Sequence, residues 1–190
     1  MTGVPMNPGR PERDRKEVRT MRYYFAYGSN MNLDQMAHRC PDAEVVGRAV
    51  LKDYRLVFRG NRNGNGVASV VPDPGKEVQG LLWKITSRCE QSLDFYEGYP
   101  RLYGKEEINV QTKTGEVAKV AVYIMNEPYQ SQPALPSDYY LQGILDGCRQ
   151  NHLTQKEVHW AVEETKKELG EKKPEKMRPK QKAVRKDTSR

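Results

Sequence analysis

Short apolar runs separated by turn-forming residues fill the middle of this 190-residue chain. Such runs predict strands, and we expect them at residues 23–27, 45–50, 54–58, 67–71, 78–85, 107–112 and 117–125. Pro72-Asp73-Pro74-Gly75 is a strong turn signal that should end the fourth run. Gly80 inside the fifth run predicts a bulge or a close approach of another backbone. The last two runs flank Lys113-Thr114-Gly115-Glu116 and predict a hairpin.

Helical periodicity is limited to a few segments. Asn32 as an N-cap, with Gln35 three residues later, predicts a helix that starts at Leu33. Further helices are expected at 87–97, between Thr86 as cap and Gly98 as stop, and at 137–151 and 154–162. Because strands do not alternate regularly with helices, the order predicts an α+β fold. The strands could close into a barrel.

Charge locates the borders of the folded domain. The formal net charge of +7 lies at the two ends, since residues 1–20 net +2, residues 163–190 net +5 and residues 21–162 net zero. Both ends lack apolar periodicity, so we expect a disordered arm at 1–20, one domain at 21–162 and a basic, disordered tail at 163–190. A neutral domain argues against nucleic-acid binding by the fold, although the tail could make weak, salt-sensitive contacts.

The cysteines and the apolar runs indicate the compartment. Cys40, Cys89 and Cys148 are odd in number and widely spaced, which supports neither a disulfide framework nor a zinc site. No apolar stretch approaches the length of a membrane span, and the N-terminal residues lack the apolar region of a signal peptide. We therefore expect a cytoplasmic protein without a metal. The sequence leaves the oligomeric state open.

The first candidate site is the segment Tyr23-Tyr24-Phe25-Ala26-Tyr27-Gly28-Ser29-Asn30-Met31. A strand that stops at Gly28 and leads at once into a helix leaves unpaired backbone N–H groups, which bind carboxylates or phosphates. The structural alternative is a tight turn that needs a positive φ at Gly28. Ser29 could in principle be a nucleophile, but no histidine is near it in sequence, and a hydrogen-bonding loop role is favoured.

The second candidate is Glu97, which ends the helix predicted before Gly98. Backbone carbonyl groups at a helix C-terminus disfavour a carboxylate. The aromatic neighbours Phe95, Tyr96 and Tyr99 are expected to desolvate it. Both effects raise the pKa of a carboxyl group toward the range useful for proton transfer near neutral pH. The structural alternative is an exposed glutamate with a surface role.

Together these segments resemble the γ-glutamyl cyclotransferase family, the AIG2-like group. Tyr27-Gly28-Ser29-Asn30 and the later segment Leu93 to Gly98 carry the likeness, which extends over about residues 21–153. The Gly66-Val67-Ala68-Ser69 and Val78 to Trp83 strands, Val122-Tyr123 and Pro136 to Tyr140 are also similar to the family. The loop after Glu97 and the segment after Val162 are not. The resemblance therefore supports the reaction class better than the substrate.

The resemblance implies a small mixed β-barrel with a few peripheral helices and a cavity for a γ-glutamyl compound. It implies an intramolecular aminolysis without cofactor or metal, in which the substrate's α-amine attacks its γ-carbonyl to give 5-oxoproline and a free amine. Glu97 would be the general acid and base. Tyr27, Gly28, Ser29 and Asn30 would bind the substrate with Tyr140, although the adjacent Tyr139 leaves that last assignment open.

Other interpretations remain possible at this point. The domain could be a non-catalytic module that binds a small ligand while its basic tail docks a partner; a carboxylate in the pocket argues against this. Cys148, His152 and His159 match no zinc spacing, and core or surface roles are favoured. The leaving amine is not determined by these residues.

Overall fold

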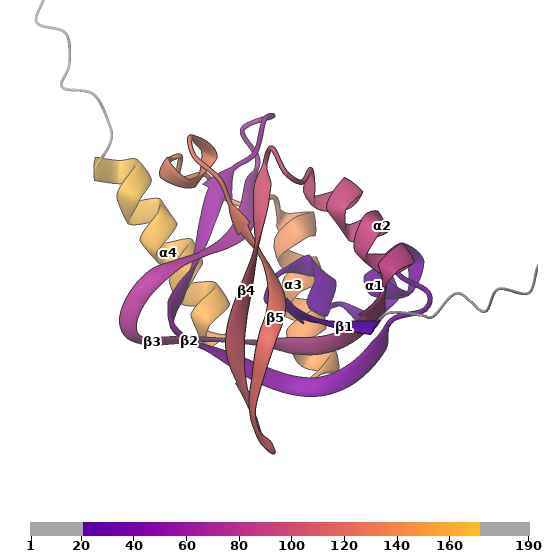
Figure 1. Cartoon of the computed structure of the whole chain (residues 1–190). Coiled ribbons are helices and arrows are strands. Elements are labelled where there is room, and N and C mark those ends of the chain that lie inside the picture. The colour runs from indigo at the N-terminus through magenta and orange to yellow at the C-terminus, as the bar shows by residue number, and fades with distance from the viewer. Residues whose placement is uncertain (1–20, 172–190) are drawn as a thin grey trace, which may run out of the picture.

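The computed structural model describes residues 21–171, which form a closed five-stranded barrel with helices around it (Figure 1). The strands follow the order β1-β3-β2-β4-β5 around the barrel. Strands β1 and β5 pair in parallel and the other neighbours are antiparallel. The α+β fold and the mixed barrel are thus confirmed. The strands are β1 Met21–Ala26, β2 Glu44–Gly60, β3 Gly66–Thr86, β4 Tyr103–Thr112 and β5 Gly115–Met125.

Strands β2 and β3 are each longer than the sequence predicts. The prediction of two strands on either side of Lys52-Asp53, and of a strand end at Pro72, was wrong. The ladder pairs Lys52 with Glu77 and Tyr54 with Pro72, so residues 73–76 bulge out opposite Asp53 without ending the strand. The Asp53 carboxylate accepts a hydrogen bond from the Gly75 N–H at 2.9 Å, which holds the excursion in place.

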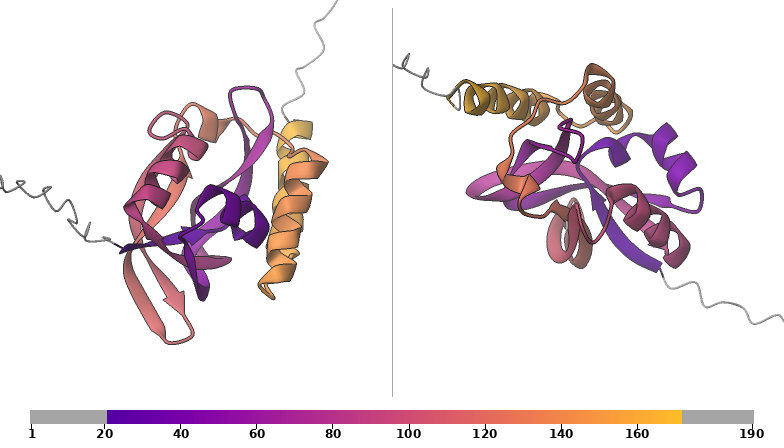
Figure 2. Two further views of the ribbon diagram at one scale, coloured as in Figure 1. Left: turned by 90° about the vertical axis from the view of Figure 1, so that its right-hand side faces the viewer. Right: turned by 90° about the horizontal axis from the view of Figure 1, so that it is seen from above.

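Local capping signals position the helices as expected. Asn32 accepts from the N–H of Gln35 at the start of α1 (Leu33–Arg39), and Thr86 caps α2 (Ser87–Glu97) in the same way. Ser137 caps α3 (Asp138–Gln150), and two 3-10 turns occur at η1 (Ser29–Met31) and η2 (Tyr129–Ser131). Figure 2 shows α3 and α4 (Lys156–Glu171) together on one side of the barrel, with α2 away from α4.

The folded part extends past the predicted border at residue 162. Helix α4 continues to Glu171, and it packs along β2. Thr165 is buried, and Glu168 forms an ion pair with the buried Arg59 at 3.0 Å. Residues 163–171 therefore belong to the domain, and the expectation of a disordered tail was wrong for them. The arm at 1–20 and the remaining tail at 172–190 lie outside the described residues.

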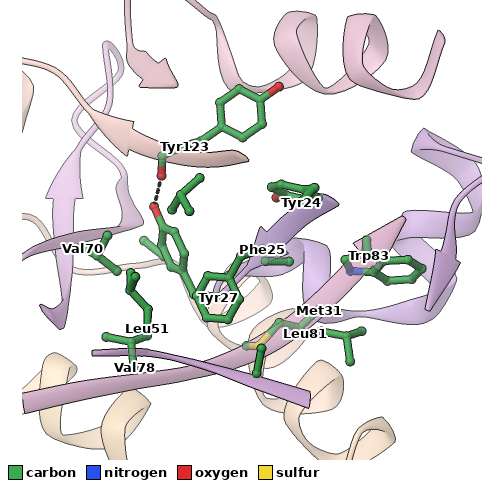
Figure 3. Close-up of a cluster of buried hydrophobic side chains, with 14 of the residues drawn as sticks. Tyr24, Phe25, Tyr27, Met31, Leu51, Val70, Val78, Leu81, Trp83 and Tyr123 are labelled. Carbon is green, nitrogen blue, oxygen red and sulfur yellow. Dashed lines mark hydrogen bonds between the residues drawn. The ribbon is translucent and has the colours of Figure 1, made fainter. Parts of the chain in front are cut away.

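The buried apolar side chains of the barrel and its helices form one cluster, which includes Phe25, Leu51 and Leu81 (Figure 3). Gly80 permits the close approach that the sequence predicts, because a β-carbon there would lie 2.3 Å from the carbonyl oxygen of Ala26. No helix within residues 21–171 combines the length and apolar character that crossing a bilayer requires.

Candidate active site

A pocket of about 240 Å³ opens where β1 leads into η1 and where α2 ends. Its size suits a small molecule. The residues around it come from nearly every part of the barrel, and they are Tyr24, Tyr27, Gly28, Ser29, Asn30, Asn61, Val67, Ala68, Tyr96, Glu97, Leu102, Tyr103, Tyr123 and Tyr140. Among these described lining residues, Glu97 alone has a charged side chain. The structure thus brings together the two candidate segments, which are about seventy residues apart in the sequence.

The loop from Gly28 to Asn30 forms one wall of the pocket. Gly28 has φ −119°, so the turn does not need a positive φ at this position, and that interpretation was wrong. A β-carbon at Gly28 would lie 3.2 Å from Ala68 and 3.5 Å from the Tyr140 hydroxyl, so close packing is what favours glycine here. No acceptor within residues 21–171 engages the backbone N–H groups of Gly28, Ser29 or Asn30. They remain available to a ligand.

Glu97 ends α2 as predicted, and Gly98 stops the helix in the left-handed conformation with φ 66°. The N–H of Tyr99 donates to the carbonyl of Asp94 at 2.9 Å and closes the helix end. Because the helix cannot continue past Gly98, Glu97 stays at its terminus, where its carboxylate accepts a hydrogen bond from Nδ2 of Asn30 at 2.8 Å.

Burial raises the pKa of Glu97 to about 7, while the positive charge of Arg39 and the hydrogen bond from Asn30 lower it. The direction is the one expected, but part of the expected cause was wrong. The Phe95 side chain is 91% exposed and points away from the protein, so it cannot desolvate Glu97. The desolvation comes instead from the pocket walls, which bring buried side chains from other strands and from α3.

Arg39 is a residue that sequence reasoning missed. It lies in the last turn of α1, and its guanidinium donates to Oδ1 of Asn30 at 2.5 Å, to Oγ of Ser29 at 3.2 Å and to Oε1 of Gln35 at 2.7 Å. It also stacks on the Tyr96 ring, 3.8 Å from the ring centre. The i, i+4 spacing of Gln35 and Arg39 is a signal of a shared helix face, but nothing in the sequence indicates that this face meets the loop.

Two of the predicted tyrosines lie in the pocket wall. Tyr140 lines the pocket, and its hydroxyl accepts from the N–H of Ala68 at 3.1 Å, whereas Tyr139 is 85% exposed. The geometry therefore selects Tyr140 over its neighbour. Tyr27 is buried, and its hydroxyl donates to the backbone carbonyl of Tyr123 at 2.5 Å (Figure 3). That bond ties the β1 end of the pocket to β5.

Three further tyrosines line the pocket that the sequence did not assign to substrate binding: Tyr24, Tyr103 and Tyr123. Tyr24 accepts from Nδ2 of Asn30 at 2.8 Å, and Tyr103 donates to the carbonyl of Ala68 at 2.6 Å. Burial, with the nearby Glu97 carboxylate as a smaller cause, raises the pKa of Tyr24 and Tyr103. Burial also raises the pKa of Tyr123, with its hydrogen bond to the Asp94 carboxylate as the next cause. These phenols stay neutral near pH 7 and form an uncharged wall. No local sequence signal separates them from ordinary core tyrosines.

Ser29 has the surroundings of a hydrogen-bonding loop residue. Its hydroxyl accepts from Arg39 and shares a 3.3 Å hydrogen bond with the hydroxyl of Tyr96. Neither partner is a general base of the kind that activates a serine nucleophile. The side chains of residues 21–170 contain no group of three or more potential ligands that could hold a metal ion. Within that range His152 and His159 are exposed, while Cys148 is buried.

Comparison with known proteins gives one consistent result. Residues 24–142 match the model of the family described as "Gamma-glutamyl cyclotransferase, AIG2-like". The chain is 36% identical over 138 residues to a human gamma-glutamylcyclotransferase, covering 68% of this chain and 71% of that protein, and it is 36% identical to the mouse protein over 140 residues, covering 70% and 72%. A solved structure of a gamma-glutamyl cyclotransferase superimposes with a TM-score of 0.64 at 31% identity, covering 77% of this chain and 87% of that chain.

Proposed function

This chain belongs to the AIG2-like γ-glutamyl cyclotransferase family and is a cyclotransferase, and on that premise we propose that Glu97 carries out the proton transfers of the reaction. The supporting observation is the raised pKa of Glu97, about 7, in a small pocket whose other lining residues are uncharged. The substrate is a γ-glutamyl amide of a small amine or amino acid, and the products are 5-oxoproline and the free amine.

Proton balance requires a group that both accepts and donates. The α-ammonium of the substrate gives up two protons as its nitrogen becomes the ring amide, and the leaving nitrogen receives two as it departs as an ammonium ion. The new C–N bond forms at the γ-carbonyl carbon, and the bond from that carbon to the leaving nitrogen breaks. Glu97 takes each proton from the attacking amine and returns it to the leaving group. A pKa near the working pH suits both roles, and such assistance accelerates reactions by about 10²–10⁴-fold.

The loop from Gly28 to Asn30 holds the anionic end of the substrate in this proposal. Its three backbone N–H groups have no acceptor among the described residues, and the residues that carry them line the same pocket as Glu97. Oriented N–H groups bind carboxylates without a cationic side chain. Tyr27 and Tyr140 line the same pocket and would restrict the substrate, so that the α-amine stays close to the γ-carbonyl. Positioning of this kind can supply as much rate as the proton transfer.

Buried thiols support a reducing, cytoplasmic location as a further part of the proposal. Cys40, Cys89 and Cys148 are all buried and unpaired. Free cysteines of this kind are typical of proteins kept in a reducing compartment.

The test is a panel of γ-glutamyl amino acids and γ-glutamyl amines, with 5-oxoproline measured by mass spectrometry. We expect the wild-type chain to release 5-oxoproline and Glu97→Gln to release about 100-fold less or lower still. Glu44→Gln, which removes an exposed carboxylate on β2, is the matched control and should behave as wild type. Undiminished turnover by a folded Glu97→Gln protein would refute the assigned role of Glu97.

A further inference from the structure

Arg39 is linked to Glu97 through a single side chain. Its Nη1 donates to Oδ1 of Asn30 at 2.5 Å, and Nδ2 of the same amide donates to Oε1 of Glu97 at 2.8 Å. Asn30 is buried, and Tyr24 accepts a second bond from its Nδ2. The amide thus stands between a cation and the carboxylate, with each of its polar ends occupied.

The orientation of the Asn30 amide follows from the chemistry of its neighbours. A guanidinium group can only donate hydrogen bonds, so the amide oxygen has to face Arg39. The amide nitrogen then has to face Tyr24 and Glu97. Without the guanidinium, the amide could turn over and present its oxygen to Glu97, an arrangement that favours the protonated carboxyl group.

We propose that Arg39 is a positioning residue of the reaction: by fixing the Asn30 amide, it keeps an N–H donor on the Glu97 carboxylate and favours the ionised base. This rests on the proposed role of Glu97. Three contacts hold the Arg39 guanidinium itself, namely the side-chain oxygens of Ser29 and Gln35 and the face of the Tyr96 ring. A planar fork suits such simultaneous contacts better than an ammonium group does.

No residue that lines the pocket around Glu97 in the described part of the chain is positively charged, so Arg39 is the cation that acts on this carboxylate. The pocket presents these tyrosines, from β1, α2, β4, β5 and α3: Tyr24, Tyr27, Tyr96, Tyr103, Tyr123 and Tyr140. Asp94, one turn earlier on α2, is paired with Lys105 of β4 at 2.7 Å. Burial raises the pKa of Glu97, and Arg39 is the charged group that lowers it. Removal of the Arg39 side chain should therefore raise the pKa of Glu97 further, because one of the effects that oppose burial is lost.

The experiment compares pH profiles of kcat/KM for wild type and Arg39→Met. We expect the acid limb, on which activity rises with pH, to move up by about one pH unit in the variant. Arg39→Lys keeps a positive group that only donates, and it should return the limb toward the wild-type position. Arg88→Met, an exposed substitution on α2, is the matched control and should leave the profile unchanged.

A second measurement does not depend on turnover. The side-chain carboxyl carbon of Glu97, followed by NMR in protein labelled at glutamate, should titrate at higher pH in Arg39→Met than in wild type. If Arg39→Met does not fold, Arg39→Gln replaces it with the same expected direction, because a glutamine side chain can accept as well as donate. An unshifted titration and an unshifted acid limb would overturn the positioning role.

The two proposals can fail separately. Full activity of Glu97→Gln refutes the role of Glu97, and the acid limb then reports another group. An inactive Glu97→Gln protein, combined with an unshifted limb in the Arg39 variants, leaves the role of Glu97 standing and refutes that of Arg39. A loss of activity in Arg39→Met that is equal at every pH would also contradict the proposal, because a purely structural defect has that signature.

Discussion

Asp94 and Glu97 lie one turn apart on α2, yet their surroundings are opposite. The Asp94 carboxylate contacts Nζ of Lys105 at 2.7 Å and accepts a hydrogen bond from the hydroxyl of Tyr123 at 2.5 Å. The Glu97 carboxylate accepts from an uncharged amide, that of Asn30. Asp94 therefore has a counterion in direct contact, while Glu97 is half-buried in the pocket and meets a neutral donor there.

This difference shows how one helix can both be fixed to the barrel, through Asp94, and present a carboxylate to the pocket, through Glu97. The ion pair of Asp94 with Lys105, which also contacts Glu90 at 2.7 Å, fixes α2 against β4. With the helix held there, its last residue can carry a carboxylate whose ionised form is disfavoured by burial. Burial raises the pKa of Glu97 to about 7, and a carboxyl group with such a pKa is suited to exchange protons at neutral pH.

Replacing each of the two carboxylates by its amide should give the largest difference in activity between the two positions. We expect Glu97→Gln to lower kcat/KM by about 10²–10⁴-fold, because the amide cannot accept and return protons. Asp94→Asn should retain most of the activity, since the change leaves the pocket chemistry intact. Steady-state kinetics on the best substrate of the panel, with circular dichroism to check folding, would test this. Equal losses in the two variants would contradict the contrast.

The titration of Glu97 should make the free energy of unfolding depend on pH. Its pKa is about 7 in the folded protein, against 4.5 for an ordinary glutamate side chain, so ionisation of Glu97 opposes folding. Stability should be highest where the group is protonated in both states, decline as pH rises between about 4.5 and 7, and stay lower above that. Glu97→Gln removes this effect and should be more stable than wild type at pH 8 by about 1–3 kcal/mol.

Urea unfolding of wild type and Glu97→Gln at several pH values would measure that gain. The difference should vanish well below pH 4.5, where the wild-type carboxyl group is protonated in both the folded and the unfolded state. A difference that is constant across the range would show that Glu97 does not titrate as the pocket requires.

Removing the counterion of the anchoring region should have a smaller effect. Lys105→Met leaves Glu90 and Asp94 without their shared cation, and Lys105 is largely buried, with 15% of its side chain exposed. We expect a loss of about 1 kcal/mol in the free energy of unfolding. Arg149→Met serves as the comparison variant, because it breaks an exposed ion pair on α3, and it should lower the free energy of unfolding by less. Thermal melts that rank these variants in the reverse order would contradict the anchoring role of Lys105.

Phe95 should give the smallest effect. It is 91% exposed, although its position two residues before Glu97 suggested a desolvating role. We expect Phe95→Ser to change stability by less than about 0.5 kcal/mol and to leave the acid limb of the pH profile in place. A shift of that limb would show that Phe95 covers Glu97 in solution.

The predicted fold was right wherever short-range signals decide the structure. The caps at Asn32 and Thr86 and the stop at Gly98 act through hydrogen bonds and backbone geometry within a few residues. The hairpin of β4 and β5 likewise follows from its own turn, with Thr112 paired to Gly115.

The errors fall where a distant partner overrides such signals. The turn sequence from Pro72 to Gly75 became a bulge, because the ladder with β2 resumes on both sides of it. Charged residues after Val162 suggested a tail, but burial of Thr165 and the pairing of Arg59 with Glu168 recruit them into α4. Glu163 pairs with Lys166, and Glu164 pairs with Lys167. This spacing of three residues is typical of an exposed helix face, and a count of net charge does not detect it.

The sequence by itself determined the elements of the site: the loop at Gly28, the helix end that carries Glu97 and the family that both resemble. These depend on residue types within single segments, which local backbone preferences can interpret. Tertiary structure alone decided that the two segments meet in one pocket and that Tyr140 rather than Tyr139 enters it. It also decided that Arg39 is linked to Glu97 through Asn30. Closure of the barrel sets those distances, and the environment that results is what moves the pKa of a carboxyl group.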